Sequence, residues 1–237
     1  MTVSELAPIR ALLFDLDGTL VDTEVQTAQA IEAVAARHGV PDFSLPIVET
    51  HGVTWPDIAR RILQLTGIGV TATQLADEMQ SQWNALTGHA RPVPGASAAL
   101  HAAAAAGLRL AIVSSSPHSV IDSFAARLGV AGIVATTARI GGDEVSQGKP
   151  APEGFLRAAQ VLGVTPGETL VFEDSRAGLT AARRAGMASV YITCCAGLDP
   201  ENAALATAQC RDYEALPADF WLALQRGAYP LQGRRFA

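Results

Sequence analysis

Short apolar segments that alternate with longer helical patterns constrain the fold of this 237-residue chain more than any other feature. They are rich in aliphatic and β-branched residues, as expected for strands buried on both faces of a parallel sheet. The segments are Ala11 to Phe14, Leu108 to Val113, Ile133 to Thr137, Thr169 to Phe172 and Ser189 to Thr193. Helical patterns between them end at a glycine, the residue best suited to a helix C terminus, namely Gly107, Gly129, Gly163 and Gly186. From residue 95 onward, this alternation predicts βαβ units.

Residues 22–94 interrupt the alternation with three helical patterns and no evident strand. The first carries Ile31 and Val34 on one face and stops at Gly39, the second runs from about Pro56 to Gly67, and the third contains Leu75, Met79 and Trp83. The fold class predicted is α/β, a Rossmann-like parallel-sheet core with a small α-helical cap domain inserted after the first strand. Residues 1–21 and 95–237 would form the core, and residues 22–94 the cap.

The charge balance argues against nucleic acid as a partner. The formal net charge is −6, whereas nucleic-acid-binding domains generally carry a basic patch. No apolar stretch approaches the roughly 20 residues of a membrane-spanning helix, and the first ten residues lack a signal-peptide core. Cys194, Cys195 and Cys210 have the spacing neither of a disulfide framework nor of a metal site. We therefore expect a cytoplasmic protein with reduced cysteines and no membrane association.

Polar side chains gather where the predicted strands end. The first segment runs into Asp15-Leu16-Asp17-Gly18-Thr19, the second into Ser114-Ser115-Ser116, and the fourth into Glu173-Asp174-Ser175. Ligands of open parallel sheets bind beyond the carboxyl ends of the strands, so these groups should converge. Lys149, the only lysine among 17 basic residues, precedes the fourth segment. Clustered carboxylates and a point cation indicate a site for Mg²⁺ and a phosphoryl group.

These strings occur in the order found in the haloacid dehalogenase superfamily of phosphotransferases. The matching pieces are Phe14 to Thr19, Ser114, Lys149-Pro150 and Glu173-Asp174-Ser175. The chain resembles that family over nearly its whole length, including the helical insertion. Within the family, the insertion and the string Asp22-Thr23-Glu24 most resemble the subgroup of β-phosphoglucomutase and small sugar-phosphate phosphatases.

The resemblance implies a role for each acid. Asp15 would be the nucleophile that forms an aspartyl-phosphate. Asp17 would protonate the leaving alcohol and then activate water. Mg²⁺ would be held by the carboxylates of Asp15 and Asp174 and by the backbone carbonyl of Asp17. Glu173 would bind the metal directly, orient a metal-bound water or contact the metal ligands; the alternative is that it is an ordinary loop acid.

The resemblance also assigns the groups that bind phosphate. Ser114 and the backbone N–H of Ser115 would hold the phosphoryl oxygens, and Lys149 would neutralise both Asp15 and the group in transfer. A metal-independent dehalogenase is disfavoured, because Asp17 and Asp174 are both present.

Hydrolysis is favoured over the mutase reaction on two departures from the mutase pattern. That family has a cap histidine twelve residues after the nucleophile, where this chain has Thr27. A phosphate-gripping arginine follows its Gly-Val-Ser string, whereas here Trp55 follows Gly52-Val53-Thr54. A β-phosphoglucomutase-like phosphotransferase remains the alternative.

Four further residues are candidates for substrate contact, each with a structural alternative. Glu24 could line the cleft between cap and core, and His51 begins the expected specificity loop of the cap. Trp55 could stack on a sugar face or pack at a helix start. His118 could contact substrate or simply open a solvated helix.

A regulatory class also has to be weighed. Receiver-type domains accept phosphate on an aspartate, bind Mg²⁺ and use a Lys-Pro pair, but they need about half this length. They place the acceptor after the third strand, where Ile133 to Thr137 runs instead into Ala138-Arg139-Ile140-Gly141. The expected partner is therefore a small-molecule phosphomonoester; its identity and the oligomeric state are left open by these residues.

Overall fold

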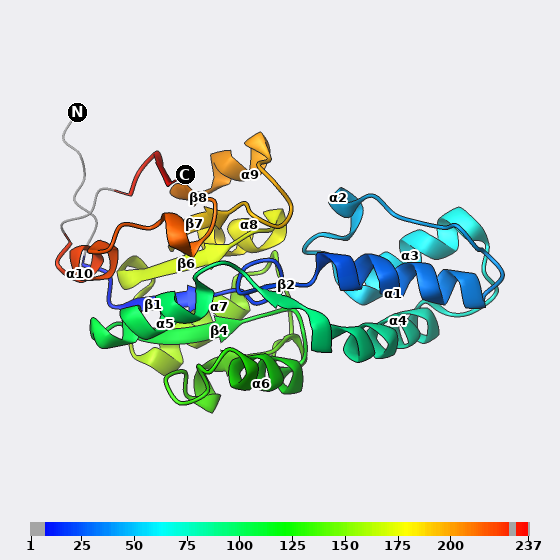
Figure 1. Cartoon of the computed structure of the whole chain (residues 1–237), viewed down its shortest axis with the longest axis horizontal. Coiled ribbons are helices and arrows are strands. Elements are labelled where there is room, and N and C mark those ends of the chain that lie inside the picture. The colour runs from blue at the N-terminus through cyan, green and yellow to red at the C-terminus, as the bar shows by residue number, and fades with distance from the viewer. Residues whose placement is uncertain (1–7, 228–230, 237) are drawn as a thin grey trace. The chain divides into compact units, whose positions relative to one another are not determined.

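The computed structural model describes residues 8–227 and 231–236 (Figure 1). The chain divides into two compact units. Met1–Val21 together with Pro92–Ala237 form one, called here the core unit, and Asp22–Arg91 form the other, called the helical unit. Each is described by itself below.

The core unit is built on a parallel sheet. Within the described residues, seven strands pair in the order β5-β4-β1-β6-β7-β8-β9. They are β1 Ala11–Phe14, β4 Arg109–Val113, β5 Arg139–Ile140, β6 Thr169–Glu173, β7 Ala188–Ile192, β8 Ala208–Cys210 and β9 Arg234–Phe236. Every adjacent pair is parallel, and Leu13 of β1 lies opposite Ala111 and Val171. All four residues of β1 are completely buried, which explains why they read as an unbroken apolar run.

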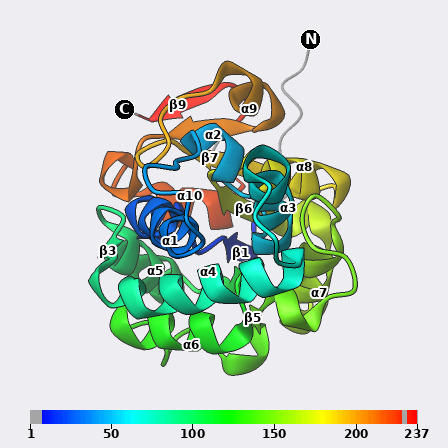
Figure 2. The ribbon, with the colours of Figure 1, turned by 90° about the vertical axis from the view of Figure 1, so that its right-hand side faces the viewer.

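Helices cover both faces of this sheet, as right-handed crossovers between parallel strands require. Figure 2 shows α5 and α10 on one side of the sheet and α7 and α8 on the other. The helices of the core unit are α5 Ala96–Ala105, α6 His118–Arg127, α7 Glu153–Leu162, α8 Arg176–Arg184, α9 Pro200–Leu205 and α10 Phe220–Gln225. The Rossmann-like α/β class is confirmed. In the described ranges, no helix is both long and apolar enough to cross a bilayer.

One expected strand is wrong. The segment Ile133–Thr137 forms a turn, because the amides of its first two residues both donate to the carbonyl of Val130 at 3.0 Å. The guanidinium of Arg139 then donates to the carbonyls of Ala131 and Val134, at 2.8 and 2.6 Å. The buried side chain of Arg139 thus occupies the Val134 carbonyl, an acceptor within the expected strand, and β5 starts only at Arg139.

The helical unit packs around its own apolar cluster. Its helices are α1 Glu24–Arg37, α2 Ile47–Thr50, α3 Trp55–Thr66 and α4 Ala72–Leu86. Thr71 closes a capping box at the start of α4, and Gly67 ends α3 in the left-handed conformation. Buried side chains from three helices form the cluster, including Ile31, Val34, Ile58, Ile62, Leu75 and Met79. The apolar periodicity of residues 22–94 therefore comes from packing inside this unit.

Shorter elements complete the chain. A two-stranded sheet contains β2 Val21–Asp22 and β3 Arg91–Pro92. The 3₁₀ helices are η1 Thr87–His89, η2 Thr136–Ala138, η3 Gly142–Glu144, η4 Pro166–Glu168 and η5 Tyr213–Ala215.

Candidate active site

The acidic turn after β1 is held by backbone hydrogen bonds. The amide of Asp15 donates to the carbonyl of Phe172 on β6 at 3.0 Å, which fixes the nucleophile candidate at the carboxyl end of β1. Gly18 follows with a φ of 78°. A Cβ at Gly18 would lie 1.7 Å from Oδ2 of Asp174. Glycine is required here both by the backbone conformation and by the carboxylate that presses against it.

Asp15, Glu173 and Asp174 meet in one buried group. Their exposed fractions are 6, 0 and 2%, and their oxygen atoms lie within 4.8 Å of one another. The ammonium of Lys149 contacts Oδ1 of Asp15 and lies 2.5 Å from Oε1 of Glu173. Thr19 donates to Oδ1 of Asp174 at 3.1 Å. The structure therefore brings together residues that are up to 159 positions apart in the chain.

The pKa values of Asp15 and Lys149 are shifted by their surroundings in this group. Burial raises the pKa of Asp15; Lys149 opposes this, and the charges of Glu173, Asp174 and Asp17 raise it further. Burial alone would lower the pKa of Lys149, but its contacts with Asp15 and Glu173 outweigh that and raise the pKa. One ammonium against three carboxylates leaves an excess of buried negative charge. A divalent cation with hard oxygen ligands fits this donor set.

Glu173 is the anchor of the site, a role that the sequence left undecided. Its Oε2 accepts from the amide of Ser175 at 2.7 Å and from the Ser175 hydroxyl at 2.9 Å, while Oε1 contacts Lys149. Both carboxylate oxygens are thus committed to protein groups. Asp15 and Asp174 remain the better ligands for a cation, and Glu173 instead orients Lys149.

Gly178 on α8 makes room for Glu173 and was not singled out from the sequence. A Cβ at this position would lie 1.7 Å from Oε1 and 1.9 Å from Cδ of Glu173. The sequence signal was a glycine inside a helical pattern, which costs stability unless close packing requires it.

Lys149 lies in a turn ahead of α7. Glu153, the first residue of α7, accepts the amides of Ser146 and Gln147 at 2.8 and 2.9 Å. Arg184 donates to the carbonyl of Pro150 at 3.0 Å. These bonds fix the turn on both sides of the lysine; the Lys149–Pro150 peptide bond is cis.

Asp17 is oriented by the serine loop. Its Oδ2 accepts from the hydroxyls of Ser116 and Ser114 at 2.9 and 3.2 Å. The Ser114 hydroxyl also accepts from the amide of Ser116 at 2.9 Å. Ser115, between these two serines, is exposed. Ser116 was not predicted as a site residue, because a third serine in a row carries no separate signal in the sequence.

Gly141 and Gly142 allow the turn at η3 to lie close to the serine loop. A Cβ at Gly142 would lie 2.3 Å from the Ser115 carbonyl oxygen, and one at Gly141 would lie 2.4 Å from the His118 amide. His118 itself contacts Oε2 of Glu144 at 2.7 Å through Nδ1. These contacts give His118 a structural function in joining α6 to η3.

Comparison with known proteins decides the family. A model of haloacid dehalogenase-like hydrolases matches residues 9–186. The chain belongs to this family. All the core-unit candidates from Asp15 to Asp174 lie inside the matched region.

Two relatives and one solved structure are similar to this hydrolase. The chain is 35% identical to "Protein CbbY" of Rhodobacter capsulatus, over 76% of this chain and 83% of that protein. It is 34% identical to validoxylamine A 7'-phosphate phosphatase of Streptomyces hygroscopicus subsp. limoneus, over 78 and 85% of the two chains. The crystal structure of CbbY from Rhodobacter sphaeroides in complex with phosphate is similar, with a TM-score of 0.67, 26% identity and coverage of 78 and 86%.

The remaining candidates lie in the helical unit of the hydrolase. Glu24 and His51 form a pair, with 3.2 Å between Oε1 and Nδ1. Trp55 packs against the apolar cluster, and its ring centroid lies 6.4 Å from that of Trp83 at a T-shaped angle. Packing at a helix start therefore accounts for Trp55.

Proposed function

We propose that this hydrolase is a Mg²⁺-dependent phosphatase of small phosphomonoesters that works through an aspartyl-phosphate on Asp15. The observation that carries the proposal is the buried group of Asp15, Lys149, Glu173 and Asp174. Buried ionisable groups with perturbed pKa values, here Asp15 and Lys149, are typical of a catalytic centre.

Each chemical step is assigned to a residue of this chain. The Asp15 carboxylate attacks phosphorus, and Lys149 offsets the charge of the nucleophile and of the phosphoryl oxygens. Ser114 offers its hydroxyl to a phosphoryl oxygen once a substrate displaces Asp17 from it. Asp17 gives a proton to the leaving alcohol and later takes one from the water that hydrolyses the aspartyl-phosphate.

The donor set fits a magnesium ion. The carboxylates of Asp15 and Asp174 and the backbone carbonyl of Asp17 are the groups that would hold it. When bound, the ion supplies positive charge to the phosphoryl oxygens. Glu173 fixes Lys149 beside this set.

Hydrolysis is favoured over the mutase reaction by the contacts of Thr27 and Trp55. Thr27 donates to the carbonyl of Thr23 at 3.0 Å and accepts from Nε1 of Trp83 at 3.2 Å. Both residues thus serve the internal packing of the helical unit, where a mutase needs groups that bind a second phosphate. The relative named validoxylamine A 7'-phosphate phosphatase supports hydrolysis of a phosphate ester as the reaction.

Substrate selection is assigned to the helical unit. Residues 22–94 would act as a cap over the core formed by residues 1–21 and 95–237. Glu24 and His51, paired within that unit, are the polar groups we assign to substrate contact.

The test is phosphate release from a panel of sugar, polyol and carboxylate phosphates. We expect turnover with Mg²⁺, none after chelation, and none for Asp15→Asn. Exchange of glucose 1-phosphate into glucose 6-phosphate serves as the mutase control. Unchanged turnover after chelation, or an active Asp15→Asn, would reject the mechanism.

A further inference from the structure

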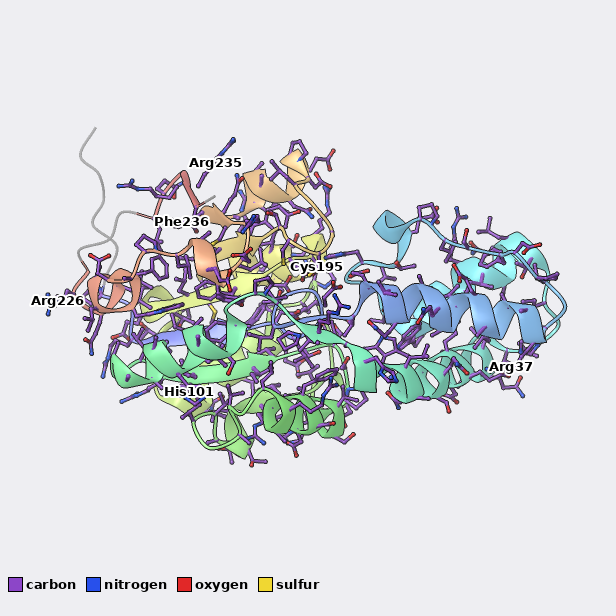
Figure 3. All side chains as sticks on the ribbon, viewed as in Figure 1. Arg37, His101, Cys195, Arg226, Arg235 and Phe236 are labelled. Carbon is purple, nitrogen blue, oxygen red and sulfur yellow. The ribbon has the colours of Figure 1, made fainter. Side chains whose placement is uncertain are left out.

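Cys194 and Cys195 are adjacent thiols on the turn that follows β7; Figure 3 labels Cys195. Their sulfur atoms lie 3.3 Å apart in a hydrogen bond, and both side chains are half-buried. In the parallel pairing of β6 and β7, Glu173 lies opposite Tyr191. The thiol pair therefore follows β7 at the same end of the sheet as the catalytic carboxylates.

The third cysteine is of a different kind. Cys210 is buried and its thiol donates to the carbonyl of Asp212 at 2.8 Å. Burial raises the pKa of the Cys210 thiol to about 12, helped by the charge of Asp212. Since the thiolate is the reactive form, Cys210 is inert at neutral pH and is a matched control for the pair.

We propose that Cys194 and Cys195 form a reversible redox site, which glutathione-type disulfides close and thiols reopen, and that closure slows the hydrolase. One thiolate of the pair attacks the small disulfide, forming a mixed disulfide and releasing one small thiol. The second thiolate attacks the mixed disulfide, the Cys194–Cys195 bond forms, and a second small thiol leaves. The pair loses two electrons and two protons, and the small disulfide gains them.

The adjacency of the two residues makes the bond easy to reopen. Cα atoms across one trans peptide are about 3.8 Å apart, below the roughly 4.4–6.8 Å of ordinary disulfides. A disulfide between neighbours is therefore strained, and strained disulfides are the more readily reduced ones. This suits a switch rather than a permanent crosslink.

Tyr213 follows β8 and packs against the strands that carry the acids. Its ring centroid lies 6.2 Å from that of Phe14 and 5.6 Å from that of Phe172, the residues directly before Asp15 and Glu173. Backbone bonds hold the turn in place: the Thr193 amide donates to the Cys210 carbonyl and the Gly197 amide to the Thr193 carbonyl, both at 3.0 Å. Formation of the Cys194–Cys195 disulfide must change this turn, which follows β7, the strand next to β6.

The experiment treats the reduced full-length protein with glutathione disulfide and measures intact mass, the linked peptide and kcat. We expect a loss of two hydrogens, a Cys194–Cys195 link and a several-fold fall in kcat that dithiothreitol reverses. Cys195→Ser should abolish the loss of two hydrogens and the link, because the second step of the exchange then has no thiol, and Cys210→Ser should retain all three responses.

A link to Cys210, a persistent glutathione adduct, an unchanged mass or an unchanged kcat in the linked protein would each overturn the proposal. The effect on kcat rests on the proposed phosphatase function, whereas the mass change does not. If that function is wrong, the reduced protein releases no phosphate and the mass measurement still tests the dithiol.

Discussion

Replacing Gly178 by alanine tests whether the buried carboxylate of Glu173 organises the site. The new Cβ would lie 1.7, 1.9 and 2.6 Å from Oε1, Cδ and Oε2 of Glu173. No carbon can occupy those positions, so the carboxylate must leave. It would give up its contacts with the Ser175 amide at 2.7 Å, the Ser175 hydroxyl at 2.9 Å and Lys149 at 2.5 Å.

The magnitude follows from these contacts. Separating a buried charge from its partners costs about 3–5 kcal/mol, and alanine offsets at most about 1 kcal/mol in a helix. The free energy of unfolding should therefore fall by about 2–4 kcal/mol, which lowers Tm by roughly 10 °C for a chain of this size. Lys149 would then be held by Asp15 alone and would be less well positioned, so kcat should fall by up to about 100-fold.

Calorimetry and steady-state phosphate release measure the two effects. Gly167→Ala is the control, since a Cβ there meets no atom within 4 Å and should change stability by less than about 0.5 kcal/mol. In a Glu173→Ala background the obstruction is gone, so Gly178→Ala should cost almost nothing, a coupling of about 2 kcal/mol or more. A cost as large in that background as in the wild type would refute the reasoning.

Three further substitutions test individual roles by steady-state kinetics. Asp17→Asn should lower kcat by about 10²–10⁴-fold with little change in KM, because the proton donor is lost; a wild-type rate would reject its role as general acid. Lys149→Arg should also lose most activity, since a planar fork cannot replace a point cation between Asp15 and Glu173; full activity would make the lysine incidental. Ser116→Ala should lower kcat about tenfold by removing a charged hydrogen bond to Asp17, and Ser116→Thr should restore it; equal losses in the two variants would contradict this.

Local patterns sufficed for much of the core. β1, β4, β6 and β7 fall within one residue of the apolar runs that predicted them. Strands buried on both faces must be apolar throughout, so the signal is contained in a few adjacent residues. The helix ends were equally readable, because glycine at a helix C terminus is a local conformational requirement: Gly107, Gly129, Gly163 and Gly186 all have positive φ.

The strands at one edge of the sheet could not be predicted from local sequence patterns. β8 and β9 are three residues long and contain polar residues such as Gln209 and Arg234. β8 becomes a strand by pairing with the edge of β7, and β9 by pairing with β8. Ile133–Thr137 shows the converse, since this run was expected to be a strand but forms a turn in which the Val134 carbonyl accepts from Arg139.

The sequence by itself determined which chemical groups end each strand: carboxylates, hydroxyls and one lysine. The tertiary structure decided how they divide the work. It set Lys149 between Asp15 and Glu173, turned Ser116 onto Asp17, and pressed Glu173 against Gly178. These contacts join residues far apart in the chain, except for the Glu173–Gly178 pair across one turn. A pairing of this kind depends on the relative placement of strands and helices, which packing of the whole core unit sets and no local window of residues contains.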